Sequence, residues 1–162
     1  MIFLIIGTQK FQFNRLLKQV DGLVKNGLID APVIAQTGNS DYTPRHYSYS
    51  RFYDKNEFEK YVEDAEMIIT HSGVGAIMTA VKRKKKIVVV PRLRKYGEHV
   101  DDHQREIARA FEKKGYVVRC EENDALDEII IKCRDFVPPG YLEHSNEIVK
   151  IINDFLNGEK LQ

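Results

Sequence analysis

The sequence predicts an α/β protein built on one doubly wound, Rossmann-like parallel sheet. Three short runs rich in isoleucine and valine are typical of strands that helices cover on both faces: Ile2–Ile6, Met67–Thr70 and Ile87–Val90. Segments with the apolar spacing of helices lie between these runs, and strands that alternate with helices imply βαβ units. At 162 residues the chain is long enough to bury one substantial core. We therefore predict a single domain over residues 1–162.

Each remaining element is predicted from a more local pattern. Three further strands are expected at Pro32–Gln36, His46–Phe52 and Tyr116–Arg119. The apolar spacing of one helix face is found at Phe13, Leu16, Leu17, Val20 and Leu23. Asp54 and Glu57 have the spacing of a capping box at the start of a second helix. Further helices are expected after Ala76, through Ile107–Phe111 as far as Gly115, over Ala125–Cys133 and over Asn146–Leu156.

Composition and charge exclude several classes of protein. A net charge of +1 provides no global attraction to nucleic acid or to an anionic membrane. Cys120 and Cys133 have no metal-binding spacing, and a reduced interior explains them without a disulfide. The apolar start at residues 1–6 is too short for a signal sequence or a membrane span. We expect a cytoplasmic protein that binds no nucleic acid and reaches any membrane through a partner.

Polar and flexible residues follow three of the predicted strands, where parallel sheets bind their ligands. These segments are Gly7-Thr8-Gln9, residues 71–76 and residues 91–97. Gly73 and Gly75 allow a close backbone approach, and the helix that follows presents unpaired N–H groups, so the turn favours a phosphate or diphosphate. A tight turn without a ligand would need the same glycines. Neither a GxGxxG fingerprint nor a P-loop accompanies the turn.

Charged residues and histidines near these segments allow two interpretations each. The basic run at residues 82–86 lies at the opposite edge of the sheet and predicts a solvated turn. Arg92 follows a strand, so it either stabilises phosphate charge or lies in a solvated loop. His99 and His103 would share one face of a helix, but a metal site there lacks a third ligand, and we expect none. His71 either takes part in chemistry or orients the glycine turn.

The block that begins at His71-Ser72-Gly73-Val74-Gly75, continues through Ile87–Pro91 and ends with His103-Gln104 and Gly115 resembles a known family. It is similar to the C-terminal, donor-binding domain of glycosyltransferase family 28. The likeness is greatest to the short subunits of two-subunit bacterial exopolysaccharide and capsule glycosyltransferases, and of the dolichol-linked N-acetylglucosaminyltransferase. The resemblance covers nearly the whole chain. It implies half of a GT-B glycosyltransferase that uses a UDP-sugar without a catalytic metal or other cofactor.

The resemblance also implies where a donor would bind. The loop after the first strand would approach the pyrophosphate, the main chain at Phe52-Tyr53 would hold the uracil, and Gln104 would bind sugar hydroxyls. Many relatives have a ribose-binding glutamate where this chain has Thr79, so ribose recognition is either weaker or arranged differently. The residues predicted to bind the donor are Gly7, Thr8, Tyr53, Ser72, Gly73, Val74, Gly75, Thr79, Arg92, His103 and Gln104.

The implied reaction is transfer of a hexose from UDP to a lipid-pyrophosphate-linked sugar in polysaccharide biosynthesis. GT-B enzymes hold donor and acceptor on two domains, and this chain has room for one. A membrane-associated partner subunit would therefore bring the lipid-linked acceptor, and it would recruit the chain to the inner face of the membrane. The C-terminal helix, at about residues 143–157, either docks on this partner or packs in the core.

The catalytic base is not identified from the sequence, and His71 is the one candidate within this chain. Two other functions stay open: a non-catalytic nucleotide-binding regulatory subunit, and an unrelated α/β enzyme that uses a nucleotide. No GxSxG elbow supports a hydrolase. Whether the isolated chain self-associates is also open.

Overall fold

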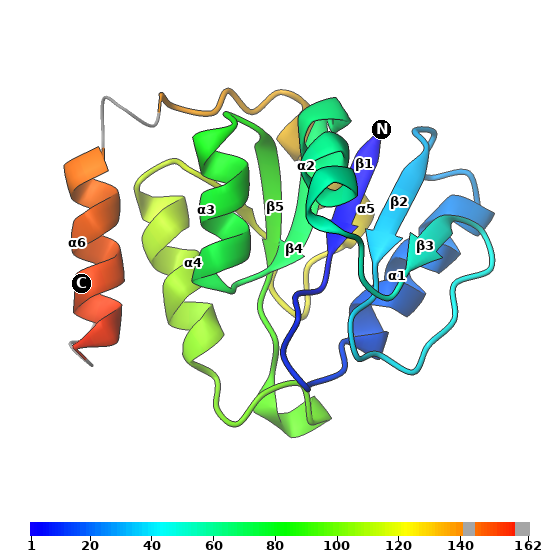
Figure 1. The fold of residues 1–162 in the computed structure, drawn as a ribbon, viewed down its shortest axis with the longest axis horizontal. Helices are drawn as coiled ribbons and strands as arrows, with labels where there is room; N and C mark the ends of the chain where they lie inside the picture. Colours follow the sequence, from blue (N-terminus) through cyan, green and yellow to red (C-terminus); the bar gives the residue numbers. More distant parts are fainter. Residues whose placement is uncertain (141–144, 158–162) are drawn as a thin grey trace.

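The computed structural model describes residues 1–140 and 145–157 and confirms one parallel six-stranded sheet (Figure 1). The strands are β1 (Ile2–Ile5), β2 (Val33–Gln36), β3 (Ser48–Ser50), β4 (Met67–His71), β5 (Lys86–Val90) and β6 (Val118–Arg119). The helices are α1 (Asn14–Lys25), α2 (Lys55–Asp64), α3 (Val74–Lys82), α4 (His103–Lys113), α5 (Leu126–Arg134) and α6 (Ser145–Leu156), with a short 3-10 turn η1 (Arg94–Tyr96). The strand order β3-β2-β1-β4-β5-β6 is that of a doubly wound sheet.

The sheet separates two apolar clusters, one on each face. Along β1, Leu4 packs with residues of α1 and α5, whereas Phe3 and Ile5 pack with residues of α2, α3 and α4. Figure 1 shows the same two layers, with α2, α3 and α4 in front of the sheet and α1 and α5 behind it. Every residue of β1 is buried, because neither face of the strand meets solvent. This burial explains the unbroken apolar runs in the sequence.

The two edge strands are shorter than predicted. Of the expected strand at residues 46–52, only Ser48–Ser50 pair with the sheet, and β6 contains two residues. Edge strands pair on one side only, so fewer of their residues need to be apolar and extended. The basic run after α3 forms a turn at the amino edge of the sheet, where Lys85 Nζ donates to the carbonyl of Glu63 at 2.6 Å.

The last helix packs against α4 and also presents apolar residues to solvent. Ile148 and Ile151 are buried, while Val149 and Leu156 are 49% and 72% exposed. Core packing is therefore part of its role, and docking on a partner stays a prediction. The residues before Ser145 in its expected range, including Glu143, lie outside the described part of the chain.

Both cysteines are free and buried, and burial raises the pKa of each thiol to about 12. At neutral pH the two thiols are therefore protonated. No described helix combines the length and apolarity that crossing a bilayer requires.

A buried carboxylate fixes the connection between β2 and β3. Asp21 on α1 accepts hydrogen bonds from the Tyr42 hydroxyl at 2.7 Å and from the main-chain N–H groups of Arg45 and His46 at 3.1 and 2.8 Å. Burial alone would raise the pKa of this carboxyl group. The hydrogen bonds outweigh that effect and hold the pKa below its ordinary value of 3.8.

We expect Asp21→Asn to lower the free energy of unfolding at pH 7 by about 1–3 kcal/mol, because a charged acceptor is lost. Because the pKa of Asp21 is lower in the folded state than its ordinary value of 3.8, the ionised carboxylate stabilises the fold at pH values above 3.8. This stabilisation is lost as the pH falls through the pKa of the folded state. Urea denaturation at several pH values should therefore show the difference shrinking in acid. Asp64→Asn, at the exposed end of α2, is the matched control. An equal loss at all pH values would contradict this account.

Candidate functional site

The direction of the chain crossovers reverses between β1 and β4. From β1 the chain crosses to β2 on one side, and from β4 it crosses to β5 on the other. Doubly wound sheets bind ligands at this reversal. Since Ile5 is paired with Thr70, the loops that follow β1 and β4 leave the sheet side by side.

Two of the predicted glycines are required because His71 fills the space beside them. Gly7 has a φ of +87°, and a Cβ at this position would lie 2.7 Å from His71 Cε1. A Cβ on Gly73 would lie 2.2 Å from His71 Nε2. The imidazole therefore lies between the two loops. Gly75 is different, since nothing lies within 4 Å of a Cβ placed there.

The imidazole of His71 is neutral at physiological pH. Burial, with the nearby positive charge of Arg92, lowers its pKa to about 4. Its Nδ1 lies 3.3 Å from Thr70 Oγ1, and that hydroxyl donates to the carbonyl of Ile5 at 2.8 Å. General bases work best with a pKa near the operating pH. These contacts favour the orienting role over the catalytic one, which stays a prediction.

The start of α3 has the properties of an anion site. Gly73 is its N-cap residue and provides no side-chain hydrogen bond to the first N–H groups of the helix. Ser72, directly before it, is fully buried, and its Oγ has no hydrogen-bond partner among the described residues. Val74 and Gly75 are accessible. Free N–H groups, the helix dipole and an unpaired hydroxyl together favour a phosphate group.

Arg92 is placed differently from what a ligand-binding cation requires. Its side chain is buried, and burial lowers its pKa to about 10, so the guanidinium remains charged at neutral pH. It donates to the carbonyls of Ile6 at 2.6 Å, Phe11 at 3.0 Å and Glu98 at 3.1 Å. The guanidinium therefore joins the loops after β1 and β5, and it lies in neither a solvated loop nor an open phosphate site.

Gln104 is tied to the same network. Its Oε1 accepts the main-chain N–H of Arg92 at 3.1 Å, so the amide oxygen is already engaged. The first turn of α4, which begins at His103, is thereby attached to the end of β5. Gln104 is buried, and sugar binding by its side chain stays a prediction.

A buried ion pair that the sequence did not indicate completes this network. Glu98 is fully buried, and both of its carboxylate oxygens accept from Arg15 at 2.9 Å. The same carboxylate accepts the N–H of Leu93 at 2.8 Å. Arg15 also donates to the carbonyl of Pro91 at 3.1 Å. The start of α1 is therefore attached to the loop after β5.

Tyr53, Thr79 and Thr8, which are predicted to contact the nucleoside and the pyrophosphate, lie after β3, on α3 and after β1. The N–H of Tyr53 donates to Gln36 Oε1 at 3.1 Å, so this part of the main chain is attached to the end of β2. Thr79 lies on α3 and donates to the carbonyl of Gly75 at 2.9 Å, which leaves its oxygen as an acceptor. Thr8 is exposed beyond β1. Contact of these residues with a donor stays a prediction.

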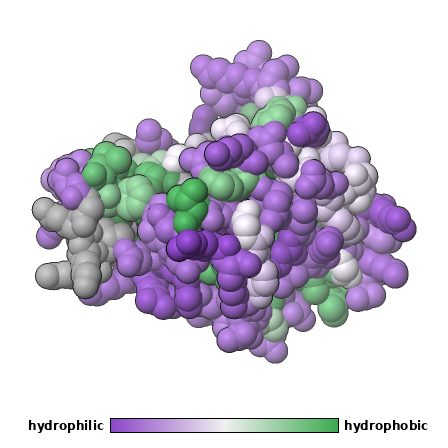
Figure 2. Space-filling view, turned by 90° about the horizontal axis from the view of Figure 1, so that it is seen from below, coloured by the Kyte–Doolittle hydropathy of each residue, from purple (hydrophilic) through white to green (hydrophobic). Residues whose placement is uncertain are grey.

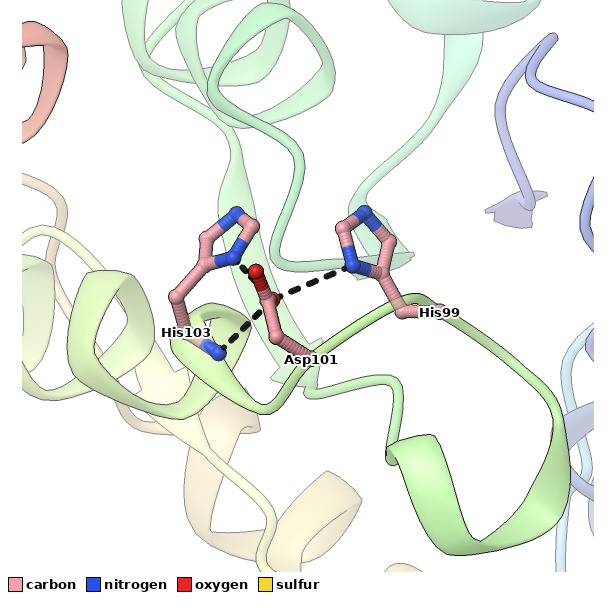
Figure 3. A group of neighbouring side chains, drawn as sticks. All are labelled: His99, Asp101 and His103. Carbon is pink, nitrogen blue, oxygen red and sulfur yellow. Dashed lines mark hydrogen bonds and ion pairs between the residues drawn. The ribbon is translucent and has the colours of Figure 1, made fainter.

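The histidines beyond β5 do not share a helix, contrary to the prediction. His103 is the first residue of α4, while His99 precedes it in the loop. Their rings nevertheless meet at a centroid distance of 4.9 Å, because the loop turns back on the helix, and Asp101 lies between them (Figure 3). A third side chain that could bind a metal, which the sequence left unidentified, therefore lies with the two histidines.

The carboxyl edge is mostly hydrophilic when seen from below (Figure 2). Apolar surface gathers on the side where α6 lies, in agreement with the exposed Val149 and Leu156.

The contact of His71 with Gly73 can be tested by a double-mutant cycle. Gly73→Ala should lower the free energy of unfolding by about 1–3 kcal/mol, because the imidazole is held against Gly7 and cannot move away. Most of that loss should disappear in a His71→Ala background. Gly75→Ala, in the same helix with open space, should be neutral or stabilising by about 0.5–1 kcal/mol. Chemical denaturation measures all four variants, and additive effects would show that the contact is absent.

Comparisons with known proteins agree with this geometry. A model of the glycosyltransferase family 28 C-terminal domain matches residues 1–150. The UDP-N-acetylglucosamine transferase subunit ALG13 of Candida albicans is 32% identical over 80 residues, which are 49% of this chain and 24% of that protein. This chain therefore spans about a quarter of the curated relative's length.

Two solved structures have the same fold. The solution structure of ALG13 aligns with a TM-score of 0.59 over 94% of this chain and 96% of that one, at 16% identity. The glycotransferase of kitacinnamycin aligns with a TM-score of 0.62 over 99% of this chain but 40% of that one, at 14% identity. These likenesses confirm the Rossmann-like architecture. With a family model matched over nearly its whole length, the chain belongs to the glycosyltransferase family 28 C-terminal domain family.

Proposed function

We propose that the chain is the donor-binding half of a UDP-sugar-dependent hexosyltransferase. The observation that carries this proposal is the start of α3, where the helix has no side-chain cap and the buried Ser72 hydroxyl has no hydrogen-bond partner among the described residues. Donors of this kind contain a diphosphate, and the diphosphate becomes more negative as the sugar departs. Preorganised N–H groups stabilise such developing charge without reorganisation.

The other donor contacts follow from this placement. With the diphosphate at Val74 and Gly75, the nucleoside would extend towards Tyr53 and Thr79, and the sugar towards His103 and Gln104. Arg92 acts in this proposal as a positioning residue, because it holds the loops after β1 and β5 in place. Its buried charge also adds a positive potential at the carboxyl edge of the sheet. The resemblance implies no metal in the transfer step.

A second polypeptide would complete the enzyme. The curated relative is named as a subunit of its transferase. We propose a membrane-associated subunit that binds a lipid-pyrophosphate-linked sugar and contributes the catalytic base. It would recruit this chain from the cytoplasm to the inner face of the membrane. The apolar surface near α6 supports docking on that side.

Because the relative is named as a UDP-N-acetylglucosamine transferase subunit, UDP-N-acetylglucosamine is the first donor to test. Synthesis of an exopolysaccharide or capsule stays a prediction from the bacterial resemblance, and the relative's name does not support it. A regulatory subunit would bind the nucleotide and transfer no sugar, even with a partner present. An unrelated nucleotide-using enzyme would prefer another nucleotide.

Calorimetric titration of the purified chain with UDP and UDP-N-acetylglucosamine tests the proposal, with ATP and NAD as controls and EDTA throughout. We expect selective binding of the uridine nucleotides. Gly75→Asp should weaken it by at least about tenfold, because a carboxylate repels the diphosphate. The substituted side chain has space, and an acid at a helix start stabilises the fold, so unfolding is not the cause.

Asn56→Asp is the matched control, since it adds the same charge to the first turn of α2. It should leave UDP affinity unchanged. A preference for ATP or NAD, or equal UDP affinity in the Gly75→Asp variant, would contradict the proposal.

A further inference from the structure

The connection between β5 and α4 contains a compact group of three metal-binding side chains. His99 and Asp101 lie in the loop, and His103 begins α4. In Figure 3 the Nδ1 atoms of both imidazoles point towards the carboxylate of Asp101. One potential ligand atom from each residue lies within 4.8 Å of the other two.

The separations between these atoms are close to those of a metal site. His99 Nδ1 lies 3.3 Å from Asp101 Oδ1, and His103 Nδ1 is in closer contact with the same oxygen. Ligand atoms about 2.0–2.1 Å from a tetrahedral zinc ion are themselves roughly 3.3 Å apart. Small rotations of Asp101 and His103 would therefore open the space for an ion.

A buried atom without a partner points to a ligand at this position. Nδ1 of His99 is buried and makes no hydrogen bond with any described residue, because its approach to Asp101 lacks hydrogen-bond geometry. A buried polar atom without a partner costs about 1–3 kcal/mol. Coordination of a cation by Nδ1 would remove that cost.

The surroundings hold the two rings in place. His99 packs on Phe11 at a centroid distance of 5.2 Å, and His103 packs on Phe155 of α6 at 5.0 Å. The adjacent Asp102 is engaged elsewhere, since its Oδ1 accepts the N–H of Arg94 at 2.8 Å. Asp101 also accepts the main-chain N–H of His103 at 3.2 Å. Ligands fixed in this way lose little freedom when they bind an ion.

We propose that His99, Asp101 and His103 bind a divalent transition metal, with Zn²⁺ as the expected ion. Two imidazole nitrogens and one carboxylate oxygen are a set that zinc accepts, with a fourth position left for water. The ion would brace the loop that leads into Gln104, and it would connect this loop with the α6 side of the domain. No step of sugar transfer depends on it, so this proposal and the proposed donor binding can fail independently.

Titration of the untagged, EDTA-treated and desalted chain with Co²⁺ tests the site, followed by competition with Zn²⁺. We expect saturable visible absorption at one ion per chain, and loss of this signal when Zn²⁺ displaces the Co²⁺. His99→Ala, Asp101→Ala and His103→Ala should each weaken Co²⁺ binding by at least about tenfold. Mutation of a residue that only orients a metal ligand already lowers metal affinity by about this factor, so removal of the ligand itself should cost at least as much. Circular dichroism checks that each variant remains folded, and the exposed Asp101 is the least disruptive position.

His46→Ala is the matched control, because His46 also lies beside an aspartate, with its Nδ1 at 3.2 Å from Asp21 Oδ1. This variant should bind Co²⁺ like the unmodified chain. Absence of saturable binding below roughly 1 mM would overturn the proposal. Affinity unchanged in all three ligand variants would overturn it as well.

Discussion

The buried guanidinium of Arg92 is the interaction on which the carboxyl edge of this domain depends. A buried charge is costly unless hydrogen bonds replace its lost hydration. Here the carbonyls of Ile6, Phe11 and Glu98 accept from the two terminal nitrogens, whereas Nε has no hydrogen-bond partner among the described residues, and the negative charge of Glu98 favours the charged form. These carbonyls belong to the loops after β1 and β5, which are far apart in the sequence. The hydrogen bonds of one guanidinium therefore hold the two loops together. Arg15 extends the network to α1 through its ion pair with Glu98.

The loops after β1 and β4 are held close together by the packing of one side chain between them. His71 occupies the space between Gly7 and Gly73. Gly38 also allows a close approach of two loops, since a Cβ at this position would lie 2.5 Å from the carbonyl oxygen of Gly7. The charge of Arg92 also helps to keep His71 neutral. At the start of α3, the Ser72 hydroxyl has no hydrogen-bond partner among the described residues. A stable frame around the uncapped start of α3 supports the proposed diphosphate site, because preorganised N–H groups need no reorganisation when charge develops.

The sequence was most informative where burial on both faces left one choice of residue. β1, β4 and β5 were predicted because covered strands must be apolar throughout, and the positions of Gly7 and residues 72–75 followed from where those strands end. The sequence was least informative about contacts between charged residues that are far apart in the chain. Nothing local indicates that Arg15 meets Glu98, 83 positions away, or that Arg92 turns inwards. The position of Asp101 could not be predicted in the same way, because a single helix over residues 99–103 would turn its side chain away from both histidines, whereas the loop before α4 brings it between them.

The central claim is that the reversal between β1 and β4 is a diphosphate site. Amide chemical shifts of the ¹⁵N-labelled chain, followed during titration with UDP, test this claim most directly because they report where the nucleotide lies. The account predicts changes that saturate together at Gly7 and Thr8 and over Ser72–Gly75. Saturable changes confined to the amino edge, around residues 82–86, would contradict it.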